Sequence, residues 1–187
     1  LWKGPEQDGI TFSLLSRYLC CKERFRLLVV EGLKPVDRFN HKMEYGNMWH
    51  VCEEVLAGKR DWSSALGLYC RELAVKYPMS RGEIEKWYDV CSLQFPIYVD
   101  YWSKHPDVLQ RTPMFQEQVF CVPYDLPSGR TVKLRGKWDS VDLIGSGNDR
   151  GVYLQENKTK GDIDEQSLRR QLKFDLQTML YLVSLKA

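Results

Sequence analysis

The sequence predicts an α/β fold in which a mostly helical first part precedes a three-stranded antiparallel meander and a final helix. Apolar residues recur at helical spacing through about the first 110 residues, whereas from about residue 115 onward they alternate, as in strands. A glycine- and asparagine-rich segment at residues 145–151 predicts a hairpin turn between two strands. The order helices, meander, helix favours a layered domain in which helices cover a mixed β-sheet.

Helical periodicity and helix-ending residues divide the first part of the chain into separate helices. The expected ranges are 11–33, 43–57, 62–76 and 81–104. Gly32 ends the first helix, Gly58 ends the second, and Pro78 follows the third. At the start of the fourth, Ser80 and Glu83 have the spacing of a capping box.

Strands are expected at residues 115–122, 131–144 and 152–158, and the final helix at about 165–185. That helix has an apolar stripe, which consists of Leu168, Leu172, Leu176, Met179, Leu180 and Val183. A neighbouring polar stripe consists of Arg170, Lys173, Gln177 and Tyr181. Such a stripe suits contacts with phosphates and bases, but the solvated face of an amphipathic helix explains it equally well.

Size and composition indicate one domain over residues 1–187, with about 1–110 mostly helical and 115–187 forming the sheet and final helix. The net charge of +2 excludes a broad cationic surface, so a positive field for nucleic acid must be local. The six cysteines form no CxxC pair, which predicts reduced thiols of an intracellular protein rather than disulfides or a zinc site. Neither a membrane span nor a signal peptide is predicted. Because the chain begins with Leu1, we expect a further segment upstream.

The residues that carry chemistry lie on the second and third expected strands. Side chains alternate along a strand, so Asp139 lies on the polar face and Trp138 on the apolar face. Glu156 and Lys158 share one face of the next strand, and the hairpin brings Asp139 and Glu156 side by side. Two carboxylates supply oxygen ligands for Mg²⁺ or Mn²⁺, and a nearby lysine can orient the attacking water or stabilise transition-state charge. Taken alone, these residues are more often a solvated face or a cross-strand ion pair.

Three short motifs follow one another in the last third of the chain: Gly136–Asp139, Glu156–Lys158 and Gln177–Tyr181. This order resembles the PD-(D/E)XK nucleases, and within them the RecB-like exonucleases, whose fingerprint joins a GxxD strand, a (D/E)xK strand and a QxxxY helix. Residues 13–25 resemble the opening helix of that branch, and Gly46–His50 resembles its GxxxH segment. Since the motifs keep the family's order over nearly the whole chain, the resemblance favours an active site over a solvated face.

The resemblance implies a restriction-endonuclease-like core and a role for each matching residue. The implied catalytic residues are Asp139, Glu156 and Lys158. The implied metal ligands are His50, Asp139, Glu156 and the backbone carbonyl of Asn157. The implied DNA-binding residues are Gln177 and Tyr181. The implied cofactor is Mg²⁺ or Mn²⁺, and the implied partner is DNA.

Other assignments near these motifs have ordinary alternatives. Without its motif, His50 is more often a core or helix-face histidine than a ligand. Glu117 resembles an acidic residue that some members of the family place near the site. Glu54, four residues after His50, is expected at the surface or behind the ligands rather than on a metal.

The sequence departs from the family's pattern in three respects. No proline precedes Asp139, which is common in the RecB-like branch. That branch has a further strand after the QxxxY helix, whereas this sequence ends at Ala187, so we expect a truncated C-terminus. Some relatives bind an iron–sulfur cluster through one cysteine near the first helix and three near the C-terminus. Cys20 and Cys21 lie near the first of these positions but no C-terminal trio is present, so no cluster is predicted in this chain.

The expected function is therefore a Mg²⁺- or Mn²⁺-dependent deoxyribonuclease, acting as an exonuclease in phage or cellular DNA replication, recombination or repair. We expect it in the cytoplasm or at the nucleoid, with a helicase or recombinase as a conceivable protein partner. One alternative is a non-catalytic DNA-binding or assembly module that retains the fold, against which the intact Asp139, Glu156 and Lys158 argue. A restriction-type endonuclease is the other, against which His50 and the QxxxY helix argue.

Overall fold

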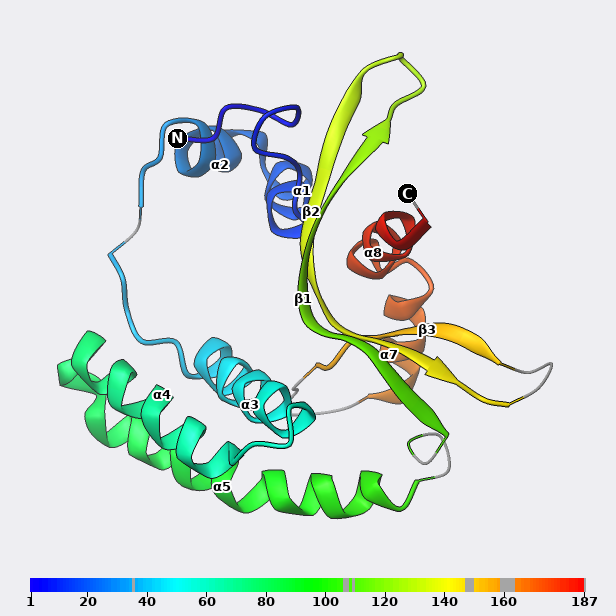
Figure 1. Ribbon diagram of the computed structural model, residues 1–187. Coiled ribbons are helices and arrows are strands. Elements are labelled where there is room, and N and C mark those ends of the chain that lie inside the picture. Colours follow the sequence, from blue (N-terminus) through cyan, green and yellow to red (C-terminus); the bar gives the residue numbers. More distant parts are fainter. Residues whose placement is uncertain (35, 106–107, 109, 147–149, 159–163, 187) are drawn as a thin grey trace. The chain divides into compact units, whose positions relative to one another are not determined.

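The computed structural model describes residues 1–34, 36–105, 108, 110–146, 150–158 and 164–186, and it divides the chain into two units. The first unit comprises residues 1–36, 117–138 and 160–187. The second comprises residues 37–116 and 139–159. The order of elements is a helical N-terminal part, a three-stranded antiparallel sheet and following helices, which confirms the predicted fold class (Figure 1).

Three helices form the core of the second unit. They are α3 (His41–Ala57), α4 (Trp62–Lys76) and α5 (Arg81–Ser103), with a short 3₁₀ turn at Pro78–Ser80 before α5. Figure 1 shows them side by side. Their facing side chains form a buried apolar cluster that includes Met48, Cys52, Leu66, Cys70, Ile84, Cys91 and Phe95. All six cysteines are free thiols, and Cys52, Cys70 and Cys91 lie in this cluster.

The sheet has the strand order β1–β2–β3. Its strands are β1 (Arg111–Asp125), β2 (Thr131–Ile144) and β3 (Gly151–Gln155). β2 pairs antiparallel with β3 from Ser140 opposite Gln155 to Ile144 opposite Gly151, which confirms the predicted hairpin; residues 147–149 of the expected turn lie outside the described part. In β2, Val132, Leu134 and Trp138 are buried, as the alternation predicts.

Two strands differ from the prediction at their ends. β1 begins at Arg111 and ends at Asp125, so it is longer than expected at both ends. β3 ends at Gln155, so Glu156 to Lys158 lie beyond the strand and outside the β2–β3 ladder. Alternation along a strand therefore does not place Glu156 and Lys158 on one face, although the two side chains do form an ion pair.

The expected helix at residues 11–33 is broken. The structure has α1 (Phe12–Cys20), α2 (Lys22–Phe25) and a π-helix at Arg26–Val30. The break is at Cys21, whose backbone is extended and whose Sγ accepts a hydrogen bond from the N–H of Arg24, so that it caps α2. Periodicity did not reveal this because the apolar spacing continues across Cys21.

The expected final helix is also two helices, α7 (Glu165–Leu172) and α8 (Leu176–Lys186). The Asp175 carboxylate accepts hydrogen bonds from both the backbone N–H and the hydroxyl of Thr178, which is how an N-cap residue starts a helix. The predicted polar stripe from Arg170 to Tyr181 is therefore interrupted. The apolar stripe is only partly buried, because Leu172, Met179 and Val183 are exposed while Leu180 is buried.

The capping box expected at the start of α5 does not form. Ser80 precedes α5, but its side chain makes no capping bond. The Glu83 carboxylate instead lies 3.4 Å from Nδ1 of His41, at the first residue of α3.

An aromatic stack explains the glycine of the Gly-Lys-Trp-Asp motif in the first unit. The ring of Phe120 on β1 stacks on Trp138 of β2, with ring centroids 4.6 Å apart, and meets Tyr181 of α8 edge-on. A Cβ at Gly136 would lie 2.6 Å from the Phe120 ring and 2.9 Å from the Tyr181 ring. Trp138 also donates its indole N–H to Ser184 of α8. Gly136 thus allows α8 to pack closely on the sheet.

A buried polar network joins β1 to β2 within the second unit. Asp142 is fully buried, and its carboxylate lies 2.9 Å from Nε of Arg111 and accepts a hydrogen bond from Ser140 Oγ. The Gln116 side-chain amide donates to both Ser140 and Asp142. These contacts hold the first residues of β1 against the part of β2 that follows Asp139.

Over the described residues, no helix combines the length and the apolar character that crossing a membrane would require.

We predict that Asp142→Ala lowers the free energy of unfolding by about 3–5 kcal/mol, because it leaves the largely buried Arg111 guanidinium without its counter-charge. Urea unfolding followed by circular dichroism measures the loss. Asp100→Ala is the matched control: its ion pair with Lys104 is exposed, so the cost should stay below about 1 kcal/mol. Equal losses in the two variants would contradict the role assigned to the network.

Candidate metal centre

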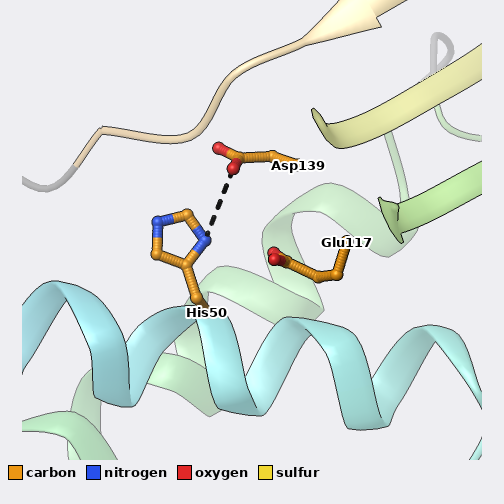
Figure 2. Close-up of side chains that lie close together, drawn as sticks. All are labelled: His50, Glu117 and Asp139. Atoms are coloured by element: carbon orange, nitrogen blue, oxygen red, sulfur yellow. Dashed lines mark ion pairs between the residues drawn. The ribbon is translucent and has the colours of Figure 1, made fainter. Parts of the chain in front are cut away.

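His50 and Asp139 face each other within the second unit. His50 lies in α3, a helix that begins where the Asn40 side chain accepts hydrogen bonds from the N–H groups of Lys42 and Met43. Asp139 follows the buried Trp138 in β2 and turns to the opposite face of the strand. The His50 Nδ1 lies 3.9 Å from Oδ1 of Asp139, and the Asp139 side chain is only 11% exposed (Figure 2).

The segment after β3 reaches Asp139 through Asn157. The backbone N–H of Asn157 donates to Oδ2 of Asp139 at 2.8 Å. This single bond places the two residues side by side even though Asn157 lies outside the ladder. It also leaves the other Asp139 oxygen as the one that faces His50.

Glu156 and Lys158 flank Asn157 and contact each other. Lys158 Nζ lies 3.0 Å from Oε2 of Glu156, whose side chain is 11% exposed while that of Lys158 is half exposed. A lysine held in this way can present its ammonium group to solvent or substrate while a largely buried carboxylate compensates its charge.

Glu53, which none of the sequence motifs includes, has its carboxylate behind Asn157. The Asn157 side-chain amide donates to Oε2 of Glu53 at 2.8 Å, and the Tyr98 hydroxyl of α5 donates to Oε1 at 2.7 Å. Burial raises the pKa of Glu53, while hydrogen bonds from Tyr98 and Asn157 and the nearby His50 oppose that rise. Burial also raises the pKa of Tyr98, and the charge of Glu53 adds to the effect, so Tyr98 remains a protonated donor.

A spacing in the sequence could have identified Glu53. Residues three apart on a helix share a face, and Glu53 lies three after His50. Its neighbour Glu54, four residues after His50, is exposed, as expected for a surface residue.

Glu117 has an unusual backbone conformation for a strand residue. Its φ angle is 49°, in the left-handed region, although it lies within β1. Such a conformation costs a non-glycine residue about 1–3 kcal/mol and in strands serves to turn a side chain in a new direction. The Glu117 side chain is 5% exposed and forms an ion pair with Lys137 of β2.

His50, Glu117 and Asp139 each offer one ligand atom, and these atoms all lie within 4.8 Å of one another (Figure 2). Glu117 is the first residue of a segment of the first unit, and it follows directly after Gln116, the last residue of a segment of the second unit. Ligands of one Mg²⁺ ion lie about 2.1 Å from it, hence at most about 4.2 Å apart. The upper limit of 4.8 Å on the separations of the three atoms is close to that range. Carboxylate oxygens with one imidazole suit a divalent ion such as Mg²⁺ or Mn²⁺.

The predicted ligand set overlaps this group in part. His50 and Asp139 belong to both. Glu156 lies outside the group, with its carboxylate against Lys158, and Asn157 contacts Asp139 through its N–H. The roles of Glu156 and Asn157 as ligands stay predictions.

The predicted DNA-binding residues lie in α8 of the first unit. The Gln177 side-chain amide donates to the Tyr181 hydroxyl at 3.3 Å. Tyr181 is buried, with its ring against Phe120 and Gly136, whereas Gln177 is partly exposed. The structure thus brings the two residues together and gives Tyr181 a packing role that the sequence did not indicate.

The family model of the PD-(D/E)XK nuclease superfamily matches residues 10–187. The chain belongs to this superfamily. Its members are nucleases that use divalent metals and act on DNA, which agrees with the histidine and carboxylates gathered around Asp139. No curated protein and no solved structure gives a significant match to the chain.

We predict that Mn²⁺ raises the unfolding temperature of the protein through this site. At a concentration one hundred times its Kd, a bound ion adds about 2.7 kcal/mol, or about 5–10 °C for a chain of this size. Differential scanning fluorimetry measures the shift. Asp139→Ala should lose most of it, whereas Asp100→Ala, with its exposed carboxylate, should retain it. An equal shift in Asp139→Ala would place the metal elsewhere.

Proposed function

We propose that this protein is a Mg²⁺- or Mn²⁺-dependent deoxyribonuclease of the RecB-like branch, acting as an exonuclease. The observation that carries the proposal is the bond from the Asn157 N–H to Asp139, because it brings the GxxD and ExK motifs together beside His50. A soluble intracellular role in DNA replication, recombination or repair, in a cell or a phage, fits such an activity.

We further propose that the two units act as one nuclease domain. β1 and β2 each contribute residues to both units, and the motifs of the family are divided between them. A catalytic domain made of only one unit would lack either His50 and Asp139 or the QxxxY helix.

The ligands proposed for the metal are His50, Asp139, Glu156 and the backbone carbonyl of Asn157, with Glu117 as a further carboxylate. A divalent ion bound there lowers the pKa of a water molecule and shields the charge of the scissile phosphate. Asp139 is held in place for this role by the N–H of Asn157, which occupies one of its oxygens.

Lys158 is the proposed proton-handling or charge-stabilising group. Its ammonium group contacts Glu156, and its side chain is half exposed. The ammonium group can therefore reach a phosphate oxygen or the attacking water without leaving the site.

Gln177 and Tyr181 are proposed to act on DNA as a pair. Because Tyr181 is buried, the amide of Gln177 is the group better placed to contact DNA, and the Tyr181 hydroxyl orients it. Tyr181→Phe would then weaken DNA binding less than Gln177→Ala.

Cleavage of end-labelled linear DNA and closed circular DNA, with Mn²⁺ or with EDTA, tests the proposal. We predict metal-dependent digestion of linear DNA only. Lys158→Ala should lose about 10²–10⁴-fold in rate, the usual contribution of an acid–base group, and Asp139→Ala should fall to background. Glu54→Ala, an exposed carboxylate on α3, serves as the control that keeps full activity.

Three outcomes separate this function from its alternatives. Digestion that persists in EDTA or in both variants would rule out the mechanism. Cutting of closed circles would rule out the exonuclease and favour an endonuclease. Binding of DNA without any cleavage would favour a non-catalytic module.

A further inference from the structure

The residues that follow β3 have no place in the β-ladder. β3 ends at Gln155, and its last partner in β2 is Ser140. Strand pairing therefore does not fix the backbone of Glu156 to Lys158, although the proposed chemistry requires these residues to keep a fixed position relative to Asp139. Side-chain contacts must supply that constraint.

Asn157 is the residue through which the segment is held. Its N–H donates to Asp139, its side-chain amide donates to Glu53, and its side-chain carbonyl accepts from Gln155. The bond to Gln155 joins residues of the same segment. The bond to Glu53 is the one that ties the Asn157 side chain to a helix.

Glu53 is itself fixed on both of its oxygens. One accepts from Asn157 of the loop and the other from Tyr98 of α5, at 2.8 Å and 2.7 Å. Both partners are neutral donors, so no cation offsets the charge of Glu53 through these bonds. A partly buried carboxylate under such conditions is costly to keep for stability alone, since an apolar residue would avoid the desolvation.

We propose that Glu53 is a positioning residue that holds Asn157, and through it Asp139 and the segment bearing Lys158, in the geometry that binds the metal. The proposal rests on the proposed function for its biological meaning. Its contacts, however, are all within the second unit and exist without metal or DNA. The hydrogen bonds of Glu53 go to Tyr98 and to the Asn157 side chain, so in this assignment it acts through Asn157.

The most direct test measures hydrogen exchange of the backbone N–H of Asn157 by NMR in metal-free protein. Glu53→Ala should speed exchange of that amide by about tenfold, as loss of one hydrogen bond to a charged group implies. Glu53→Gln should have a smaller effect. The carbonyl oxygen of the new side-chain amide can still accept from Asn157, whereas its nitrogen cannot accept from Tyr98. Glu54→Ala, the exposed neighbour on the same helix, should change nothing at Asn157.

Mn²⁺ affinity measured by calorimetry gives a second readout that needs no DNA. Loss of a group that orients ligands typically weakens metal binding about 10–100-fold. We expect a weakening in this range for Glu53→Ala, a smaller one for Glu53→Gln, and none for Glu54→Ala.

A double variant distinguishes positioning through Asn157 from general loss of structure. If Glu53 acts through Asn157, Glu53→Ala combined with Asn157→Ala should bind Mn²⁺ no more weakly than Asn157→Ala alone. Independent structural roles would instead give additive losses. Additivity, or unchanged exchange at Asn157 in Glu53→Ala, would overturn the inference.

The outcome for Glu53 is separable from that for the nuclease. If the wild-type protein cleaves DNA but Glu53→Ala leaves exchange and Mn²⁺ affinity unchanged, the positioning role is wrong and the nuclease stands. If the wild-type protein does not cleave DNA, exchange and calorimetry still decide the role of Glu53.

Discussion

The hydrogen bond from the N–H of Asn157 to the carboxylate of Asp139 is the contact on which the candidate site depends. Asp139 comes from the middle of β2, where the ladder and the buried Trp138 fix its direction. Asn157 comes from a segment that has left β3 and has no ladder to fix it. That bond fixes Asn157, and with it the segment that bears Lys158, beside Asp139. The bond therefore turns two motifs that are adjacent in the fold into one site.

The helices of the second unit contribute side chains that contact Asp139 and Asn157. α3 contributes His50 toward Asp139 and Glu53 toward Asn157, from positions three residues apart on one face. α5 adds Tyr98 behind Glu53. Burial works against the ionised Glu53, which its raised pKa reflects. The left-handed backbone conformation of Glu117 is a further cost, and Lys59, in the turn after α3, is the other described non-glycine residue with a positive φ.

The sequence predicted the regular elements well where periodicity and burial agree. The bounds of α4 and β2 and the buried face of Val132, Leu134 and Trp138 all follow from spacing. It predicted poorly where one side chain decides the backbone. Asp175 starts a new helix in a region of unbroken helical pattern, and Cys21 interrupts another. At the candidate site, the motifs name Asp139 and Lys158, whose roles stay predictions. The role of Glu53 depends on which of two adjacent glutamates faces inward, and the left-handed φ of Glu117 leaves no trace in a residue pattern.

The central claim is that Asp139 and the residues brought to it bind a divalent metal. A crystal structure of the protein grown with Mn²⁺, with anomalous diffraction data collected to locate the ion, tests it most directly. The account predicts an anomalous peak about 2.1 Å from a carboxylate oxygen of Asp139, with His50 and the carbonyl of Asn157 among the neighbouring ligands. The absence of a peak at Asp139, with Mn²⁺ bound elsewhere or not at all, would contradict the account.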